Sequence, residues 1–100
     1  MIAKEHKSNA GKILSLCDEE IIGKKYKEGD IVLDLSAEFY KGEKVSEEDA
    51  IKKLSAAYIV NAAGNNSVNI LKEKGIVTDK NIIIIQGIPF CQCLIIENER

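Results

Sequence analysis

The chain has 100 residues, which suits one domain and leaves no room for a second catalytic or binding domain. Hydrophobic residues make up 45% and charged residues 30% of it, a balance that excludes disordered, collagen-like and disulfide-scaffold proteins. The net charge of −2 excludes a domain that is basic as a whole, so nucleic-acid binding would need a local lysine cluster.

No apolar run approaches the roughly 20 residues that span a bilayer, and no export signal is recognisable at the start. We therefore expect a single cytoplasmic domain over residues 1–100 without membrane contact. Three cysteines in such a chain indicate reduced thiols rather than a disulfide framework.

The first part of the chain predicts short elements separated by turns. Its apolar and β-branched runs are brief, and clusters of glycine, asparagine, serine and acidic residues lie between them. In chain order we expect a β-hairpin formed by 2–6 and 12–17, a helical turn over 18–23, an extended segment over 24–27, a strand over 31–35 and a helical turn over 36–40.

The clearest predicted element is a helix over 46–62. Ser46 and Asp49 have the spacing of a capping box, with aspartate in place of the usual glutamate. Apolar residues then recur every three or four positions, and after Ala56 the apolar stripe widens, which indicates a helix buried nearly all round.

A second, shorter helix is expected directly afterwards. Gly64 ends the first helix, and Asn65 or Asn66 caps the second, which runs to Gly75. The two together predict a helical hairpin.

Residues 82–85 are four consecutive isoleucines, and a strand of this kind needs cover on both faces. A turn at 87–89 and a last strand over 90–96 follow. The element order β-β-β-α-α-β-β predicts an α+β domain, a mainly antiparallel sheet of about five strands with the helical hairpin on one face. The other face requires either a loop from residues 36–46 or another subunit, so a homodimer is one of two arrangements.

Four side chains, three thiols and one imidazole, are of the kind that binds zinc. Cys91 and Cys93 share one side of the last strand, and Cys17 and His6 lie on strands that could neighbour it. The spacing lacks the two close ligand pairs typical of structural zinc, and buried free thiols are usually packing groups. We therefore expect no metal, no cofactor and a solvent-facing His6.

Two segments are candidate binding sites. The backbone amides of Gly64, Asn65, Asn66 and Ser67 open a helix and could cradle an anion. A plain helix-helix turn is the favoured alternative, because the segment lacks the Gly-Lys-Ser/Thr ending of a phosphate loop. Lys24, Lys25 and Lys27, with Lys12, could form a basic face in which Tyr26 stacks on a base; the alternative is a solvated surface. Asn61, in the apolar half of the first helix, would need carbonyl partners at the helix end.

Three segments, 17–24, 28–34 and 38–43, resemble a small archaeal family known as domain of unknown function 424, and Gly87-Ile88-Pro89 is similar to its closing turn. The resemblance implies a stand-alone archaeal cytosolic protein of this size without an established activity. It also implies a histidine where this chain has Phe90, so no catalytic role is carried over.

These observations favour a non-catalytic binding module in archaeal information processing that contacts RNA or a translation protein through residues 24–27. Two alternatives belong to other classes: a small nucleotide- or metal-binding enzyme that uses residues 64–67, and a homodimeric scaffold for other proteins.

Overall fold

The computed structural model describes residues 1–95. Its strands are β1 (Ile2–Ser8), β2 (Gly11–Cys17), β3 (Lys25–Glu28), β4 (Ile31–Asp34), β5 (Glu43–Lys44), β6 (Ile59–Ala63), β7 (Ile83–Ile85) and β8 (Ile88–Leu94). The helices are α1 (Glu47–Leu54) and α2 (Asn65–Glu73), with 3-10 turns η1 (Glu19–Ile21), η2 (Glu38–Tyr40) and η3 (Asp79–Asn81). Within the described range, no helix is long and apolar enough to cross a membrane.

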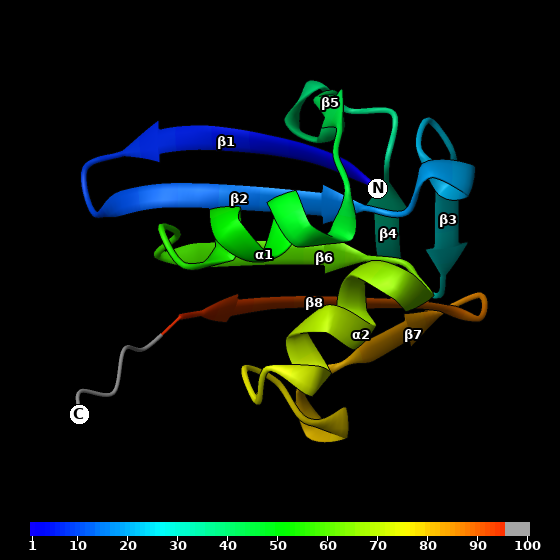
Figure 1. Cartoon of the computed structure of the whole chain (residues 1–100). Helices are drawn as coiled ribbons and strands as arrows, with labels where there is room; N and C mark the ends of the chain where they lie inside the picture. The colour runs from blue at the N-terminus through cyan, green and yellow to red at the C-terminus, as the bar shows by residue number, and fades with distance from the viewer. Residues whose placement is uncertain (96–100) are drawn as a thin grey trace.

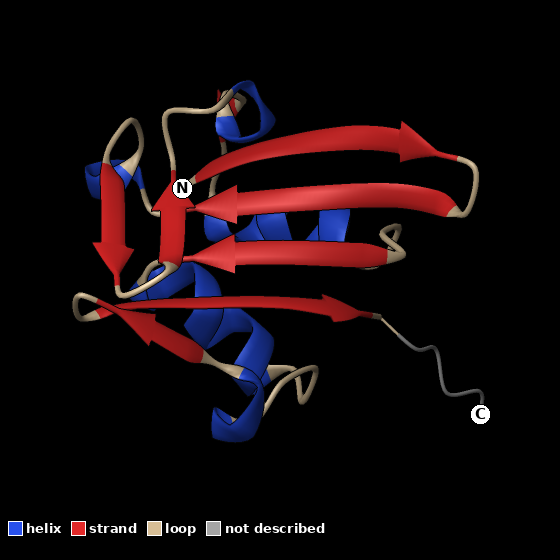
Figure 2. Ribbon diagram, turned by 180° about the vertical axis from the view of Figure 1, so that it is seen from behind, coloured by secondary structure: helices blue, strands red, loops and turns tan. Residues whose placement is uncertain are grey.

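Six strands form one sheet in the order β5-β1-β2-β6-β8-β7, and β3 pairs with β4 in a separate two-stranded ribbon. Every neighbouring pair is antiparallel except β2 and β6, which are parallel. Both helices lie on the same face of the sheet (Figures 1 and 2). The predicted α+β class with a mainly antiparallel sheet is therefore confirmed, as are the first hairpin, β4 and the short helical turns.

The predicted helix over 46–62 is wrong in its second half. Ser46 caps α1 as expected, its Oγ accepting a hydrogen bond from the Asp49 N–H at 3.1 Å, but the helix ends at Leu54. Residues 59–63 form β6, which lies between β2 and β8. An apolar run buried on all sides suits a central strand as well as a buried helix, and pairing on both edges outweighs the helix propensity of its alanines.

The helical hairpin and the order β-β-β-α-α-β-β are wrong for the same reason, because β6 separates the two helices. The second helix is confirmed as α2, although its N-cap is Gly64 rather than an asparagine. At the end of the chain the turn is Gln86–Gly87, and β8 begins at Ile88. Of the last strand expected over 90–96, Ile96 lies outside the described residues.

Alternate residues of the central strands face opposite sides of the sheet. The side under the helices is an apolar core that includes Leu14, Leu16, Val60, Ala62 and Cys91. A second apolar cluster lies on the other side, at one end of the sheet, where the β3–β4 ribbon packs against it. Its buried members are Cys17, Ile21, Leu33, Leu35, Tyr40, Ala63 and Ile85.

Of the two covers expected for this second face, the loop is found. Its 3-10 turn, η2, contacts β1 and β2, and the β3–β4 ribbon contacts β7. The expectation that both faces of the isoleucine run are covered is nevertheless wrong at two positions, because Ile83 is 47% and Ile84 is 54% exposed.

Candidate functional site

A row of polar side chains crosses the sheet on the face opposite the helices. The strand registers place Lys4 opposite Ser15, Ser15 opposite Asn61, and Asn61 opposite Gln92. We call these four residues the polar row. They face away from the helices, because the residues that alternate with them on β2 and β6 lie in the helix-side core. The row joins four strands, so only the register reveals it.

Asn61 lies near the middle of the polar row and differs from its neighbour Ser15. Ser15 is 1% exposed, and its Oγ donates a hydrogen bond to the Phe39 carbonyl oxygen at 3.0 Å. Asn61 is 6% exposed, and its side chain makes no hydrogen bond to any other residue in the range 1–95. An amide buried in this way costs about 1–3 kcal/mol, and native proteins rarely leave one unpaired. The expected partners at a helix end do not apply, because Asn61 lies on a strand.

A stacked pair of rings borders the polar row. The ring centroids of His6 and Phe39 are 4.3 Å apart, and the ring planes are 6° from parallel. The His6 Nε2 lies 3.0 Å from the Phe39 carbonyl oxygen, the same oxygen that accepts from Ser15. His6 is half-buried by these contacts, so the expectation of a solvent-facing histidine is wrong.

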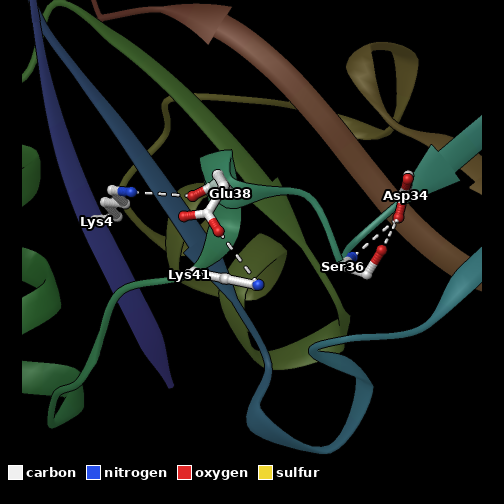
Figure 3. Close-up of polar contacts among 5 residues, drawn as sticks. All are labelled: Lys4, Asp34, Ser36, Glu38 and Lys41. Carbon is white, nitrogen blue, oxygen red and sulfur yellow. Dashed lines mark hydrogen bonds and ion pairs between the residues drawn. The ribbon is translucent and has the colours of Figure 1, made fainter.

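Polar contacts hold the η2 segment beside the row. The Lys4 Nζ donates to the Glu38 carbonyl oxygen at 3.0 Å, and the Glu38 carboxylate lies 3.3 Å from the Lys41 Nζ (Figure 3). At the start of the segment, the Asp34 carboxylate accepts from the Ser36 hydroxyl and backbone N–H, which lowers the pKa of Asp34 below its usual value. These contacts therefore hold the loop that carries Phe39 against His6, which lies on β1.

The structure separates Tyr26 from two of the lysines expected to share its face. On β3, Lys25 and Lys27 are exposed on one side, while Tyr26 points to the other and packs against the second apolar cluster. Lys12 does not join them, because it lies on β2 and pairs with Glu5 at 3.9 Å.

Two of these lysines remain as exposed cations. Lys25 lies 4.0 Å from the Asp34 carboxylate, a pair that neutralises its charge locally. Lys24 and Lys27 form no ion pair with other described residues. The β3–β4 ribbon that carries them packs on the same side of the sheet as the polar row, since it covers Cys17 and Ala63 there.

The N-terminus of α2, the candidate anion site, already binds a carboxylate of this chain, that of Asp18. The Asn66 N–H donates to the Asp18 Oδ2 at 2.9 Å, and the N–H and Oγ–H of Ser67 donate to the Asp18 Oδ1 at 2.8 and 2.7 Å. Asp18 is only 3% exposed, and the helix dipole favours a negative charge at this position. Anion binding at 64–67 stays a prediction in which the ligand must compete with Asp18.

Gly64 makes this arrangement possible. Its φ of 104° is unfavourable for other residues, and a Cβ there would lie 2.3 Å from the Asp18 Cγ. Sequence reasoning found the glycine and the asparagines but missed Asp18, because the acid precedes them by more than 40 residues.

The cysteines and His6 are not brought together. Cys17 lies in the second apolar cluster, whereas Cys91 and Cys93 face the helix-side core. Burial raises the pKa of Cys17 to about 12 and of Cys91 to about 11, and it also raises the pKa of Cys93. Thiols that stay protonated are poor nucleophiles and poor metal ligands. Among residues 1–95, no three histidine, cysteine or acidic side chains are grouped so as to hold a metal ion.

Comparison with known proteins gives a family but no activity. No functionally curated protein matches the chain. A solved structure, described as the crystal structure of an uncharacterized conserved protein from Methanopyrus kandleri, aligns with a TM-score of 0.79 at 24% sequence identity. The alignment covers 99% of this chain and 94% of that one, which shows a shared fold. The family described as protein of unknown function (DUF424) matches residues 5–96, and the chain therefore belongs to that family.

Proposed function

We propose that this protein is a non-catalytic module that binds single-stranded RNA on the sheet face that carries the polar row. The observation that carries the proposal is the amide of Asn61, which is buried and has no hydrogen-bond partner among the described residues. A carboxamide offers a donor and an acceptor side by side, which complements the hydrogen-bonding edge of an unpaired base. Gln92, directly opposite on β8 and exposed, offers a second such group.

The architecture supports the same ligand. Sequence-specific RNA recognition usually targets unpaired bases, and one common module lays them on a β-sheet with aromatic side chains. Figure 2 shows the sheet face away from both helices. Strand alternation places the polar row on this face, and the hydrogen bond from Ser15 to Phe39 places the stacked rings of His6 and Phe39 beside it. A base bound at Asn61 would have a ring pair as its neighbour.

Phosphate contacts would come from lysine side chains. Lys24 and Lys27 are exposed, form no ion pair with the described residues, and belong to a ribbon that packs on the same side of the sheet. Lysines act on phosphate as point charges. Binding at these lysines releases counterions from the RNA, so its affinity must fall as the salt concentration rises. In its finer form the proposal places this RNA in archaeal information processing such as translation.

The first test measures the affinity for a fluorescein-labelled 12-nucleotide RNA of unstructured mixed sequence by fluorescence anisotropy. We expect Asn61→Ala and Gln92→Ala each to weaken binding about tenfold, as the loss of one good hydrogen-bonding group does. Asn69→Ala is the matched control, because Asn69 is an exposed amide on α2, on the opposite side of the sheet. No binding at low salt, or equal effects at all three positions, overturns the proposal.

The second test concerns charge. Lys24→Glu combined with Lys27→Glu should weaken binding and flatten its salt dependence, whereas Lys52→Glu combined with Lys74→Glu should do neither. All four lysines are exposed and outside the ion pairs of the described residues, but the second pair belongs to the helix side. If both double variants behave alike, residues 24–27 are not part of the interface.

A further inference from the structure

The apolar edge of the sheet at β7 has exposed side chains that the RNA proposal does not use. β7 is the last strand in the order of the six-stranded sheet, so one of its edges has no neighbouring strand among residues 1–95 (Figure 1). Ile83 and Ile84 on this strand are 47% and 54% exposed, and Ile31 and Val32, at the start of the contacting strand β4, are 47% and 53% exposed. We call these four apolar residues the edge patch; on each strand its two members face opposite sides.

Ile84 directs its backbone groups toward the free edge. Gln86 and Gly87 both have positive φ, the signature of a two-residue hairpin turn that makes Ile85 and Ile88 a hydrogen-bonded pair. The next pair, Ile84 and Pro89, is then a non-hydrogen-bonded pair, whose backbone groups point away from each other. The bond from the Gly64 N–H to the Pro89 carbonyl oxygen, 2.9 Å, agrees with this orientation.

We infer that the edge patch binds a second copy of this chain, with β7 of one subunit antiparallel to β7 of the other. A two-fold axis at Ile84 lets each Ile84 N–H donate to the other Ile84 carbonyl oxygen, which satisfies both free groups at once. The same axis places the two Ile84 side chains next to each other on one face of the joined sheet. The dimer contact does not cover either polar row, because the rows lie on the face of the sheet rather than at this edge.

The charges at the two ends of β7 complement each other under this symmetry. Lys80, in η3, precedes the strand and forms no ion pair with the described residues, while its neighbour Asp79 is already paired with Lys72 at 2.8 Å. Glu28 lies at the other end, where its Oε1 accepts from the Gln86 N–H at 2.7 Å. Antiparallel pairing brings η3 of one copy beside the Gln86 turn of its partner, so Lys80 meets a carboxylate of opposite charge.

The test is sedimentation equilibrium of the full chain over a range of concentrations. We expect a reversible dimer that Ile84→Lys converts to a monomer with an unchanged circular dichroism spectrum, because a lysine at a sheet edge opposes strand pairing. Leu94→Lys is the matched control; Leu94 is similarly exposed, at 51%, but lies on β8 away from this edge, so that variant should remain a dimer. A monomeric wild type at every concentration, or equal effects of the two lysines, overturns the inference.

Crosslinking keeps the inference testable if Ile84→Lys fails to fold. Across a hydrogen-bonded antiparallel pair the two Cα atoms lie about 5.5 Å apart, within the range of a disulfide. Ile84→Cys should therefore form a covalent dimer on mild oxidation at dilute concentration, and Leu94→Cys should not. Crosslinking of both or neither contradicts the symmetric edge.

Discussion

The two faces of the central sheet are made of alternate residues of the same strands, and both bury apolar side chains, but in the middle of the sheet they differ in polarity. On the helix side, Leu14 and Leu16 are fully buried among other apolar groups. Ser15, which lies between these two leucines on β2, faces the other side, and so does Asn61, its partner on β6. Both are almost as buried as the leucines, but they are polar. Both apolar clusters therefore contribute to the stability of the fold, while the middle of the other face also buries polar groups that an apolar core would not need.

The difference extends to how buried polar groups are paired. Asp18, near one end of the sheet, receives three hydrogen bonds from the start of α2. Asn61 receives none within the described chain. The contrast indicates that the Asp18 carboxylate serves the fold, and it is the Asn61 amide to which we propose a ligand binds.

Leu16→Ala should give the largest effect, because it opens a cavity in the helix-side core. We expect a loss of about 3 kcal/mol in the free energy of unfolding, measured by urea denaturation. Leu94→Ala, on an exposed position of the other face, should cost less than about 0.5 kcal/mol. Similar losses at the two positions would remove the distinction between the faces.

Asp18→Ala should come next, with a loss of about 2 kcal/mol, because α2 loses its anionic cap and buried donors lose their acceptor. Ser67→Ala removes one of the three hydrogen bonds and should cost about 1 kcal/mol in the same assay. If removing the whole carboxylate costs no more than removing that single hydroxyl, Asp18 does not hold α2 as described.

Alkaline pH should weaken the fold through Cys17. Burial, then the nearby Asp18, raises the pKa of this thiol from 9.0 to about 12, so the unfolded chain ionises first. Stability should be unaffected by this group below pH 9 and should fall by about 1.4 kcal/mol per pH unit between 9 and 12. Between pH 8 and pH 10 the wild type should lose about 1 kcal/mol more than Cys17→Ala in urea denaturation. Parallel losses in both proteins would show that this thiol is not shielded.

The smallest effect on stability should be that of Asn61→Val. Valine suits a strand and removes an unpaired amide, so the free energy of unfolding should stay constant or rise by up to about 1 kcal/mol, while RNA affinity falls. Ser15→Val is the comparison, because it breaks a hydrogen bond to Phe39 and should destabilise the fold. A loss above about 1 kcal/mol for Asn61→Val would mean that the amide is already satisfied in the free protein.

Local patterns predicted much of the fold. The glycine-containing turn at residues 8–11 predicted the first hairpin, and the spacing of Ser46 and Asp49 predicted the start of α1. The error over residues 55–63 has a physical cause: an apolar run without alternation does not distinguish a buried helix from a central strand, and its two neighbouring strands are distant in sequence.

The candidate site was less accessible to sequence reasoning. Ser15, Asn61 and Gln92 are far apart in the chain and meet only through the register of three strands. Tyr26 was grouped with its neighbouring lysines, but the alternation of β3 turns it into the second apolar cluster. Motifs within one segment can be recognised in the sequence, whereas contacts between distant strands cannot.

The most direct test of the central claim is a nuclear magnetic resonance titration of the 15N-labelled protein with the 12-nucleotide RNA. The side-chain amide resonances of Asn61 and Gln92 should shift together with the backbone amides of β6 and β8, while the side-chain amide of Asn69 on α2 stays fixed. Shifts confined to the helix side, or no shifts at RNA concentrations that saturate the anisotropy signal, would contradict the assignment of the polar row as the binding face.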